Sequence, residues 1–483
     1  MIVVIVLIAV TPGRILMTMT TWYRRTVAAA GALTLACSLA ACGGGGSGDE
    51  GGDADTIKVW IQEDLPDRVK ATQAIVDDFT EKTGVKVDLV AVAEDQFDQL
   101  LTSSAAAGDL PDVIGGISLP QVRTLSANEL VDTDAVGELM DTLDASTFSE
   151  RAVELTSDGD TRLAVPSESW LQLLFYRKDL FEKAGLAEPN SYDSILSAAA
   201  ELDSDDMAGF VGANAPGDAF TEQTFEQVAL GNNCEMVDEK GEVLLESPEC
   251  VESFEFYGDL IQNYSVKGAQ DVDTTRASYF AGQAAMFIWS TFVLDEMAGL
   301  RNDAKPNCPE CKKDPAYLAK NTGVVTTIQG PSGDDPALFG EVTSWVVTAD
   351  SSTDPAKQFV EYMFGDGYIP WISIAPEGKV PVRLGTADSP TEYADKWGTL
   401  PAGVDTKAPL SDFYPQDVLD VLTNGTTELA RWAIPQGQGN LLGAVQGEHP
   451  VANTVNEVTT GTPADEGAKK AAETVRSIAE SVQ

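Results

Sequence analysis

The sequence predicts an α/β fold, and three observations near the start of its globular part lead to this prediction. Residues 56–62 and 85–92 alternate as strands do, and residues 111–114 form a third short apolar run. Residues 67–83 and 95–107, which separate these runs, have the apolar spacing of helices. The order strand–helix–strand–helix–strand favours a parallel sheet with right-handed crossovers.

Polar residues follow the first and third of these strands. Glu63 and Asp64 come after the first strand, and Gly116 and Ser118 come after the third. Ligands of parallel sheets bind beyond the carboxyl ends of the strands, so these two loops are expected to meet at one crevice. The alternative interpretation of Glu63 and Asp64 is an exposed acidic loop.

Composition indicates an ordinary globular protein with an acidic surface. The chain has 483 residues, enough for two or three domains, with 43% hydrophobic and 22% charged residues. Its formal net charge of −45 repels nucleic acid and anionic lipid, so no nucleic-acid partner is expected. The charge names no ligand, and a solvated, aggregation-resistant surface explains it equally well.

Few catalytic arrangements are open to this sequence. His449 is the single histidine, which leaves little room for histidine-based triads or zinc sites. The sequence has no P-loop, no dinucleotide-binding GxGxxG after a strand, no HExxH and no GxSxG. No cofactor and no metal are therefore indicated. A glycosidase, which needs only a pair of carboxylates, is the rival enzyme class.

The amino terminus is predicted to be an export signal. Arg24 and Arg25 precede an apolar run of small residues, 26–36, and the sequence Leu-Ala-Ala-Cys ends at Cys42. This site resembles the lipobox of bacterial lipoproteins, which implies a signal over 1–41 and an acylated Cys42. A plain secretory signal or an anchor helix is the alternative. The Gly-rich acidic stretch that continues to residue 55 is expected to be a flexible tether.

The stretch 162–190 is the centre of the predicted organisation. Residues 163–165 form a short strand-like run that Pro166 stops, and a polar break follows at 167–169. Trp170–Tyr176 reads as a buried strand, after which Arg177–Gly185 and Tyr192–Leu202 are predicted helices.

Four cysteines follow the predicted signal. In an exported chain, Cys234, Cys250, Cys308 and Cys311 indicate two disulfides, with three possible pairings. We favour Cys234–Cys250 and Cys308–Cys311 because each of these pairs is local. A redox CxxC or half of a zinc site at Cys308–Cys311 is the alternative.

Several sequences, in a fixed order, resemble the extracellular solute-binding proteins of bacterial ABC importers, and within them the carbohydrate-binding, maltose-binding-protein-like branch. The sequences that carry the resemblance are KVW…F.EKTGVKV and GDLPDVI in the first half-domain, YRKDLFEKAGL at 176–186, F..GQAAMFI at 280–288 and VNEVTTGTPADEGAKKAAETVRSI near the end. Each motif is weak alone. Their order and spacing across nearly the whole mature chain make the resemblance specific.

The resemblance implies the periplasmic-binding-protein-like (type II) fold. This fold has two α/β lobes, each a mixed, mostly parallel sheet flanked by helices, with a ligand cleft between them. The implied first lobe contains 56–167 and about 322–375, and the second contains 168–321 and about 376–483. The chain would cross three times between the lobes, first at the hinge near Ser167–Ser169.

The resemblance also implies a set of cleft residues. Aromatic faces pack on sugar rings, and carboxylates accept hydrogen bonds from sugar hydroxyls. Relatives often have Gly-Pro-Trp where this chain has Ser290, Thr291 and Phe292, which leaves the stacking ring open between Phe292 and Trp289. The implied ligand-binding residues are Glu63, Asp64, Gly116, Ser118, Glu168, Trp170, Trp289, Ser290, Phe292, Trp345 and Trp432.

The function implied is a lipid-anchored substrate-binding subunit of an ABC importer on the outer face of the membrane, either extracellular or periplasmic. Its expected partners are a mono- or oligosaccharide and the membrane permease subunits, and it is expected to be a monomer. Because these binders release their ligand unchanged, no enzymatic activity is expected. The alternatives are a binder of a polyamine or peptide, a surface glycosidase, and a binder that signals to a membrane sensor.

Overall fold

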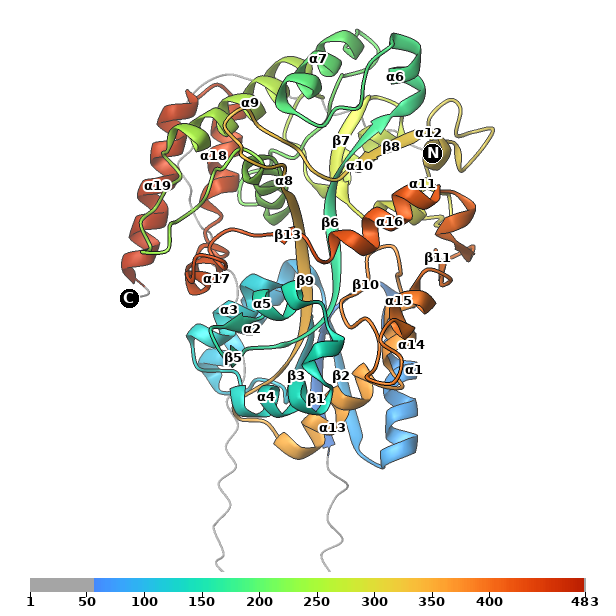
Figure 1. Cartoon of the computed structure of the whole chain (residues 1–483), viewed down its shortest axis with the longest axis vertical. Coiled ribbons are helices and arrows are strands. Elements are labelled where there is room, and N and C mark those ends of the chain that lie inside the picture. Colours follow the sequence, from blue (N-terminus) through green and yellow to red (C-terminus); the bar gives the residue numbers. More distant parts are fainter. Residues whose placement is uncertain (1–55, 482–483) are drawn as a thin grey trace, which may run out of the picture. The chain divides into compact units, whose positions relative to one another are not determined.

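The computed structural model describes residues 56–481, apart from the side chain of Asp95. The predictions for the signal at 1–41, for Cys42 and for the tether at 42–55 concern residues outside this range. Strands and helices alternate through much of the described chain (Figure 1). No helix within residues 56–481 is both long and apolar enough to cross a membrane.

The strands are β1 (Thr56–Gln62), β2 (Lys86–Val92), β3 (Val113–Ile117), β4 (Ser157–Asp158), β5 (Thr161–Arg162), β6 (Val165–Arg177), β7 (Met286–Ser290), β8 (Thr322–Val325), β9 (Leu338–Val347), β10 (Val380–Pro381), β11 (Pro401–Ala402), β12 (Ala408–Pro409) and β13 (Leu429–Ala430). The α-helices are α1 (Pro66–Thr83), α2 (Glu94–Ala107), α3 (Leu119–Ala127), α4 (Thr133–Thr142), α5 (Glu150–Leu155), α6 (Lys178–Ala184), α7 (Tyr192–Leu202), α8 (Ala219–Leu230), α9 (Pro248–Tyr264), α10 (Val272–Phe280), α11 (Val293–Met297), α12 (Tyr317–Asn321), α13 (Thr353–Phe364), α14 (Tyr368–Ile372), α15 (Glu392–Trp397), α16 (Gln416–Gly425), α17 (Gly439–Val445), α18 (Pro450–Thr459) and α19 (Ala464–Ser481).

The first half-domain has the predicted parallel order. Strand β1 pairs in parallel with both β2 and β3. Helix α1 begins with a proline in its first turn and ends at Gly84, whose φ of +82° is the left-handed conformation that glycine adopts easily. Strand β3 begins at Val113 rather than at Pro111, and the carboxylate of Asp112, just before the strand, accepts the backbone N–H of Lys58 at 2.7 Å.

Strand β6 corrects the prediction of two strands separated by a polar break. Residues Val165–Arg177 form one continuous strand, with a register shift against β9 between Pro166 and Glu168. The shift absorbs Ser167 as a bulge, so the proline bends the strand without ending it. In Figure 1, β6 and β9 run side by side through the molecule.

The two ends of β6 belong to different parts of the sheet. Its first half pairs with β9 and β10, and β9 in turn pairs with β3. Its second half, from Gln172 to Arg177, pairs with β7 and β8. Because every residue of β6 from Glu168 onward has a strand partner, the strand itself joins the two parts of the fold.

Helices α8, α9, α18 and α19 pack against one another around an aromatic core. The rings of Phe225 and Phe254 stack with their centres 4.2 Å apart. The ring of Trp432 meets Phe225 edge-on at 6.4 Å. Trp432 comes late in the chain, and this packing places it in the core of the same part of the fold as β7 and β8.

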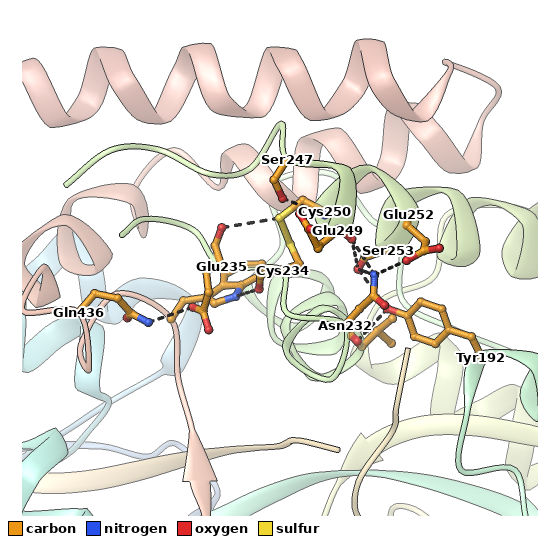
Figure 2. Close-up of a disulfide and its surroundings, with 12 residues drawn as sticks. Tyr192, Asn232, Cys234, Glu235, Ser247, Glu249, Cys250, Glu252, Ser253 and Gln436 are labelled. Atoms are coloured by element: carbon orange, nitrogen blue, oxygen red, sulfur yellow. Dashed lines mark hydrogen bonds between the residues drawn. A yellow bond between two sulfur atoms is a disulfide. The ribbon is translucent and has the colours of Figure 1, made fainter. Parts of the chain in front are cut away.

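Both favoured disulfides are confirmed. Cys234 is bonded to Cys250, and Cys308 to Cys311. Figure 2 shows the first pair beside Glu235, whose carboxylate accepts a hydrogen bond from Gln436 at 3.2 Å. The indole N–H of Trp432 donates to the carbonyl of Cys234 at 2.7 Å. The disulfide therefore closes a loop that holds the Trp432–Gln436 segment in place.

Candidate functional site

The candidate site lies where β6 and β9 pass from one part of the sheet to the other. We call this region the seam, meaning Glu168–Gln172, Phe339–Glu341 and the side chains that pack on them. Trp170 lies opposite Glu341 across the two antiparallel strands, and Gln172 lies opposite Ser290 of β7. Segments from the whole length of the chain meet here.

Glu168 is buried and fully engaged. One carboxylate oxygen accepts from the ammonium of Lys379 at 2.7 Å, and the other accepts from the indole N–H of Trp371 at 2.8 Å. The ammonium of Lys379 also lies 3.8 Å from the centre of the Trp371 ring. With only 1% of its surface exposed, Glu168 ties β6 to α14 and to Lys379, the residue before β10.

The four predicted stacking tryptophans differ in exposure. Trp170 is half-buried, 6.0 Å from the ring of Phe339, and keeps part of its surface open. Trp289 is buried and donates to the carbonyl of Val272 at 2.9 Å. Trp345 and Trp432 expose 1% and 0% of their surfaces.

The ring of Trp345 is buried because it packs on a glycine. A β-carbon built on Gly115 of β3 would lie only 2.4 Å from this ring. The missing side chain of Gly115 therefore makes the space that Trp345 fills. A tryptophan at a strand end can pack in the core or line a cleft, and sequence alone does not distinguish these two positions.

A buried ion network joins the late chain to the seam. We call it the paired cluster, meaning Glu226 of α8, Glu341 of β9 and Arg431. The Arg431 guanidinium donates to Glu341 at 2.6 Å and to Glu226 at 3.2 Å. The remaining carboxylate oxygen of Glu341 accepts the first backbone N–H of α3, Leu119, at 2.8 Å.

Every member of the paired cluster is almost fully enclosed. Although burial lowers it, the pKa of Arg431 is held above its ordinary value by the two carboxylates. Sequence reasoning missed Glu226 and Arg431. A single arginine beside Trp432 and a glutamate within a helix carry no pattern that would have indicated them.

A small cavity lies beside the paired cluster. It measures about 40 Å³ and is lined by residues that include Ser118 before α3, Glu222 and Glu226 of α8, Glu341, Arg431 and His449. This volume holds a few water molecules at most, whereas pockets for small ligands measure about 300 Å³ or more. A sugar could enter here only after the walls had separated.

His449 forms part of the wall of this cavity. Its ring nitrogen Nδ1 lies 3.0 Å from Glu222 Oε2, and this hydrogen bond raises the pKa of the imidazole. The backbone of His449 has φ = +45°, a left-handed conformation that is uncommon outside glycine. Asp218 and Asp98, which belong to separate elements, raise the same pKa further.

A second group of charged residues lies where α1 meets the segment after β7. The guanidinium of Arg68 is 3.5 Å from Glu63 and 3.9 Å from Glu377, and its central carbon is 5.2 Å from the centre of the Phe292 ring. Glu63 also accepts the backbone N–H groups of Asp64 and Leu65. Three segments far apart in the sequence therefore meet around Arg68.

Several buried polar atoms in this group have no hydrogen-bond partner within residues 56–481. We call the residues that carry them the unsatisfied cluster: Arg68 (Nε), Thr291 (Oγ1), Asp295 (Oδ1) and Glu377 (Oε2). Asp295 and Glu377 each expose 1% of their surface. Burial raises the pKa of both carboxyl groups, and each lies in the field of the other or of Arg68.

A buried polar atom without a partner costs about 1–3 kcal/mol. Native structures contain few of them, so the two carboxylates and the guanidinium of this cluster, which lie in one another's electrostatic field, call for an explanation. Donors and acceptors supplied by a ligand would remove this cost. The sequence indicated Glu63 and Phe292 next to this cluster but none of its four members.

The other predicted residues lie near the seam without forming a common contact. Gly116 has φ = +72°, which favours glycine at this turn of β3. Ser118 precedes α3, and its backbone N–H donates to Gln121 at 2.9 Å. Asp64 is exposed and Ser290 is half-buried. Ligand binding by these residues stays a prediction.

Comparison with known proteins gives a family match and a set of similar structures. The family model described as bacterial extracellular solute-binding protein matches residues 62–369. The chain is 27% identical over 318 residues to the putative ABC transporter periplasmic-binding protein YcjN of Escherichia coli K12, covering 64% of this chain and 69% of that protein.

Solved structures share the fold at low sequence identity. The GacH receptor of Streptomyces glaucescens, solved unliganded and with acarbose, has a TM-score of 0.67 at 18% identity, covering 89% of this chain and 99% of that chain. A sugar transporter of Arthrobacter chlorophenolicus with bound laminaribiose has a TM-score of 0.68 at 20% identity, covering 87% and 99%. Maltose-bound MalE3 of T. maritima has a TM-score of 0.66 at 18% identity, covering 88% and 99%. These likenesses confirm the predicted two-lobed fold.

Proposed function

The chain belongs to the family of bacterial extracellular solute-binding proteins, and from this premise we propose that it captures a sugar or oligosaccharide and delivers it to the permease subunits of an ABC importer. The proposal rests on the family match over more than half of the chain. The sugars named with the similar structures, laminaribiose and maltose among them, support the choice of solute class.

We place the solute at the seam, between the paired cluster and the unsatisfied cluster. Trp170 and Phe292 are the half-buried aromatic residues there, and each has ring surface that a sugar face would cover. Glu63, Asp64, Gly116, Ser118 and Ser290 are proposed as polar contacts. Glu168, Trp289, Trp345 and Trp432 support the site by packing in this conformation and contact solute only if the seam rearranges.

Solute entry requires the two lobes to separate, because the cavity at the seam is smaller than a sugar. The proposed lobes are 56–167 with about 322–375, and 168–321 with about 376–483. Strands β6 and β9 run from one lobe to the other, so bending within them would open the cleft. A solute that contacts both lobes only in the closed state stabilises that state.

The remaining parts of the proposal concern location and chemistry. We propose that Cys42 carries a lipid anchor, that 43–55 is the tether, and that the protein is a monomer on the outer face of the membrane. We propose that it does not cleave its solute. The unpartnered carboxylate oxygens of Asp295 and Glu377 favour a second candidate, a cationic solute such as a polyamine.

Titration calorimetry of the Thr56–Gln483 body against neutral sugars, polyamines and peptides tests the proposal. We expect saturable binding of a sugar, at micromolar affinity or about −8 kcal/mol, and recovery of the sugar intact. Trp170→Ala should weaken binding tenfold or more, and Tyr264→Ala, which removes a half-buried aromatic ring at the end of α9, is the control. A cleaved glycan would overturn the transport function, and binding of peptides alone would overturn the solute class.

A further inference from the structure

We infer that the solute carries a protonated amino group and that Asp295 and Glu377 of the unsatisfied cluster bind it. This inference rests on the proposed function and narrows its solute class to amino sugars. Both carboxylates are almost fully buried, and each has one oxygen with no hydrogen-bond partner within residues 56–481. An ammonium group has three donors and no acceptor, which suits two such oxygens.

The cations near these carboxylates are engaged elsewhere. The guanidinium of Arg301 donates to Asp303 at 2.7 and 3.2 Å. Arg276 is shared between Asp273 at 2.7 Å and Glu296 at 3.0 Å. Lys407 is exposed and contributes only at long range to the pKa of Glu377. Neither Asp295 nor Glu377 therefore has a closely bonded cation among the described residues.

Arg68 is the nearest positive charge, and it is loosely held. It lies 3.9 Å from Glu377, farther than the 2.7–2.9 Å of a charge-assisted hydrogen bond, and its Nε is unpartnered. Two buried carboxylates thus face one guanidinium, which Glu63 shares. Sugar hydroxyls would fill the open hydrogen-bond positions, but only a cation would also stabilise the charged form of the two buried carboxyl groups.

Phe292 provides an aromatic ring that a cation can contact. Arg68 already lies over its ring within the range of a cation–π interaction, so this ring accepts positive charge in the present structure. The ring packs on the backbone at Gly378, where a β-carbon would approach it to 2.1 Å. The aromatic face is therefore held in position beside Glu377.

The groups facing Asp295 and Glu377 predict that proton release accompanies binding. The two carboxyl groups face each other, Arg68, Arg301 and Lys407, and the hydroxyl of Tyr414 donates instead to the carbonyl of Leu294 at 2.7 Å. Glu296 lies next to Asp295 and is paired with Arg276. Burial raises the pKa of both carboxyl groups, and a bound ammonium group would lower it, so binding would release any proton that they hold.

The test uses three disaccharides with the same linkage. Chitobiose with two free amino groups, N,N′-diacetylchitobiose and cellobiose differ at the second carbon of each ring. We expect the Thr56–Gln483 body to bind the free amine at least tenfold more tightly than either neutral sugar. The binding enthalpy of the amine should change with the ionisation enthalpy of the buffer, while that of a neutral sugar should not.

Two variants locate the effect. Asp295→Asn and Glu377→Gln should each reduce the preference for the amine tenfold or more, measured as the ratio of its affinity to the affinity of the same variant for cellobiose. Glu255→Gln, which removes one exposed charge from α9, should leave this ratio unchanged. Melting curves of the free proteins check that each variant is folded, and the buffer comparison on the unaltered protein needs no variant.

Each outcome decides the question. Preference for cellobiose or the diacetylated sugar overturns the inference and leaves the proposed transport function in place. If the protein still prefers the amine after both substitutions, the inference is also wrong, because other residues would then bind the amino group. Binding of none of the three sugars by a folded protein counts against the inference, and binding of peptides alone counts against the proposed function as well.

Discussion

The paired cluster and the unsatisfied cluster are two buried ionic groups, and they are built differently. In the paired cluster, Arg431 bonds two carboxylates, and Glu341 also accepts a helix N–H. In the unsatisfied cluster, two carboxylates share one distant guanidinium, and each keeps an oxygen without a partner. Burial is nearly complete in both, so the difference lies in hydrogen bonding.

From this difference in hydrogen bonding we infer different roles for the two clusters. A buried charge is tolerated when its partners are close and its remaining positions are bonded, which describes the paired cluster. Where those partners are absent, the buried group lowers the stability of the free protein, and a ligand that supplies the partners can remove this cost. We therefore expect the paired cluster to contribute to folding stability and the unsatisfied cluster to contribute to binding.

Breaking the paired cluster should have the largest effect. Arg431→Met leaves Glu226 and Glu341 buried together without a cation, and the free energy of unfolding should fall by about 3–5 kcal/mol. Urea unfolding followed by circular dichroism measures this loss. Arg476→Met removes an arginine from an exposed pair with Glu246 and should cost less than about 1 kcal/mol. Equal losses in the two variants would contradict the contrast.

Removing the support beneath the paired cluster should have the next largest effect. The Cys234–Cys250 disulfide holds the loop that bonds Trp432, the neighbour of Arg431. Replacing both cysteines by serine should lower stability by about 3 kcal/mol in the chain-entropy model. Tryptophan fluorescence should shift as Trp432 gains contact with water. An unchanged melting temperature would show that the packing of Trp432 alone holds the loop.

Glu235, which lies outside the paired cluster, should make the stability of the protein depend on pH. Burial, with a smaller effect of Glu226, raises the pKa of Glu235 to about 7. A raised pKa means that the folded state favours the protonated form. The stability of the unaltered protein relative to Glu235→Gln should therefore be fully present below pH 4.5 and be lost as the pH rises through about 7.

The size of this loss should be about 1–2 kcal/mol, because the carboxyl group keeps some contact with water. Melting curves of both proteins between pH 5 and pH 8 measure it. The exposed Glu255→Gln variant reports the general effect of removing one negative charge. If Glu255→Gln reproduced the whole pH dependence, the environment of Glu235 would not be its cause.

Neutralising the unsatisfied cluster should have the smallest effect on the free protein, and in the opposite direction. Glu377→Gln removes a buried carboxyl group with one unpartnered oxygen and should raise the free energy of unfolding at pH 7.5 by about 1 kcal/mol. Thermal unfolding without solute measures it. A loss of several kcal/mol would mean that Glu377 is as well paired as Glu341.

Sequence reasoning reached the fold better than the site. Apolar periodicity located β1, α1, β2 and α2 within a residue or two, because burial repeats along each element. It failed at β6, where Pro166 and Ser167 read as a break, since a bulge depends on the strand next to it. Both local disulfides were also predictable, because each joins cysteines close in sequence.

The site was harder because its contacts are long-range. Trp345 was expected in the cleft, and only the position of Gly115 in β3 shows why its ring is enclosed. Arg431 and Asp295 follow no repeat, and their partners lie far away in the chain. Tertiary structure determines which of these charged residues pair, and no local pattern in the sequence indicates such pairs.

Strand β6 also constrains the order in which the protein can fold. Its partners β7, β8, β9 and β10 all come later in the chain, with β10 more than two hundred residues after Glu168. A chain made from its amino terminus cannot complete this sheet until most of it has been synthesised. Pairings over such sequence distances form slowly. In the nascent protein, β6 therefore has none of its strand partners until β7 has been added at Met286–Ser290.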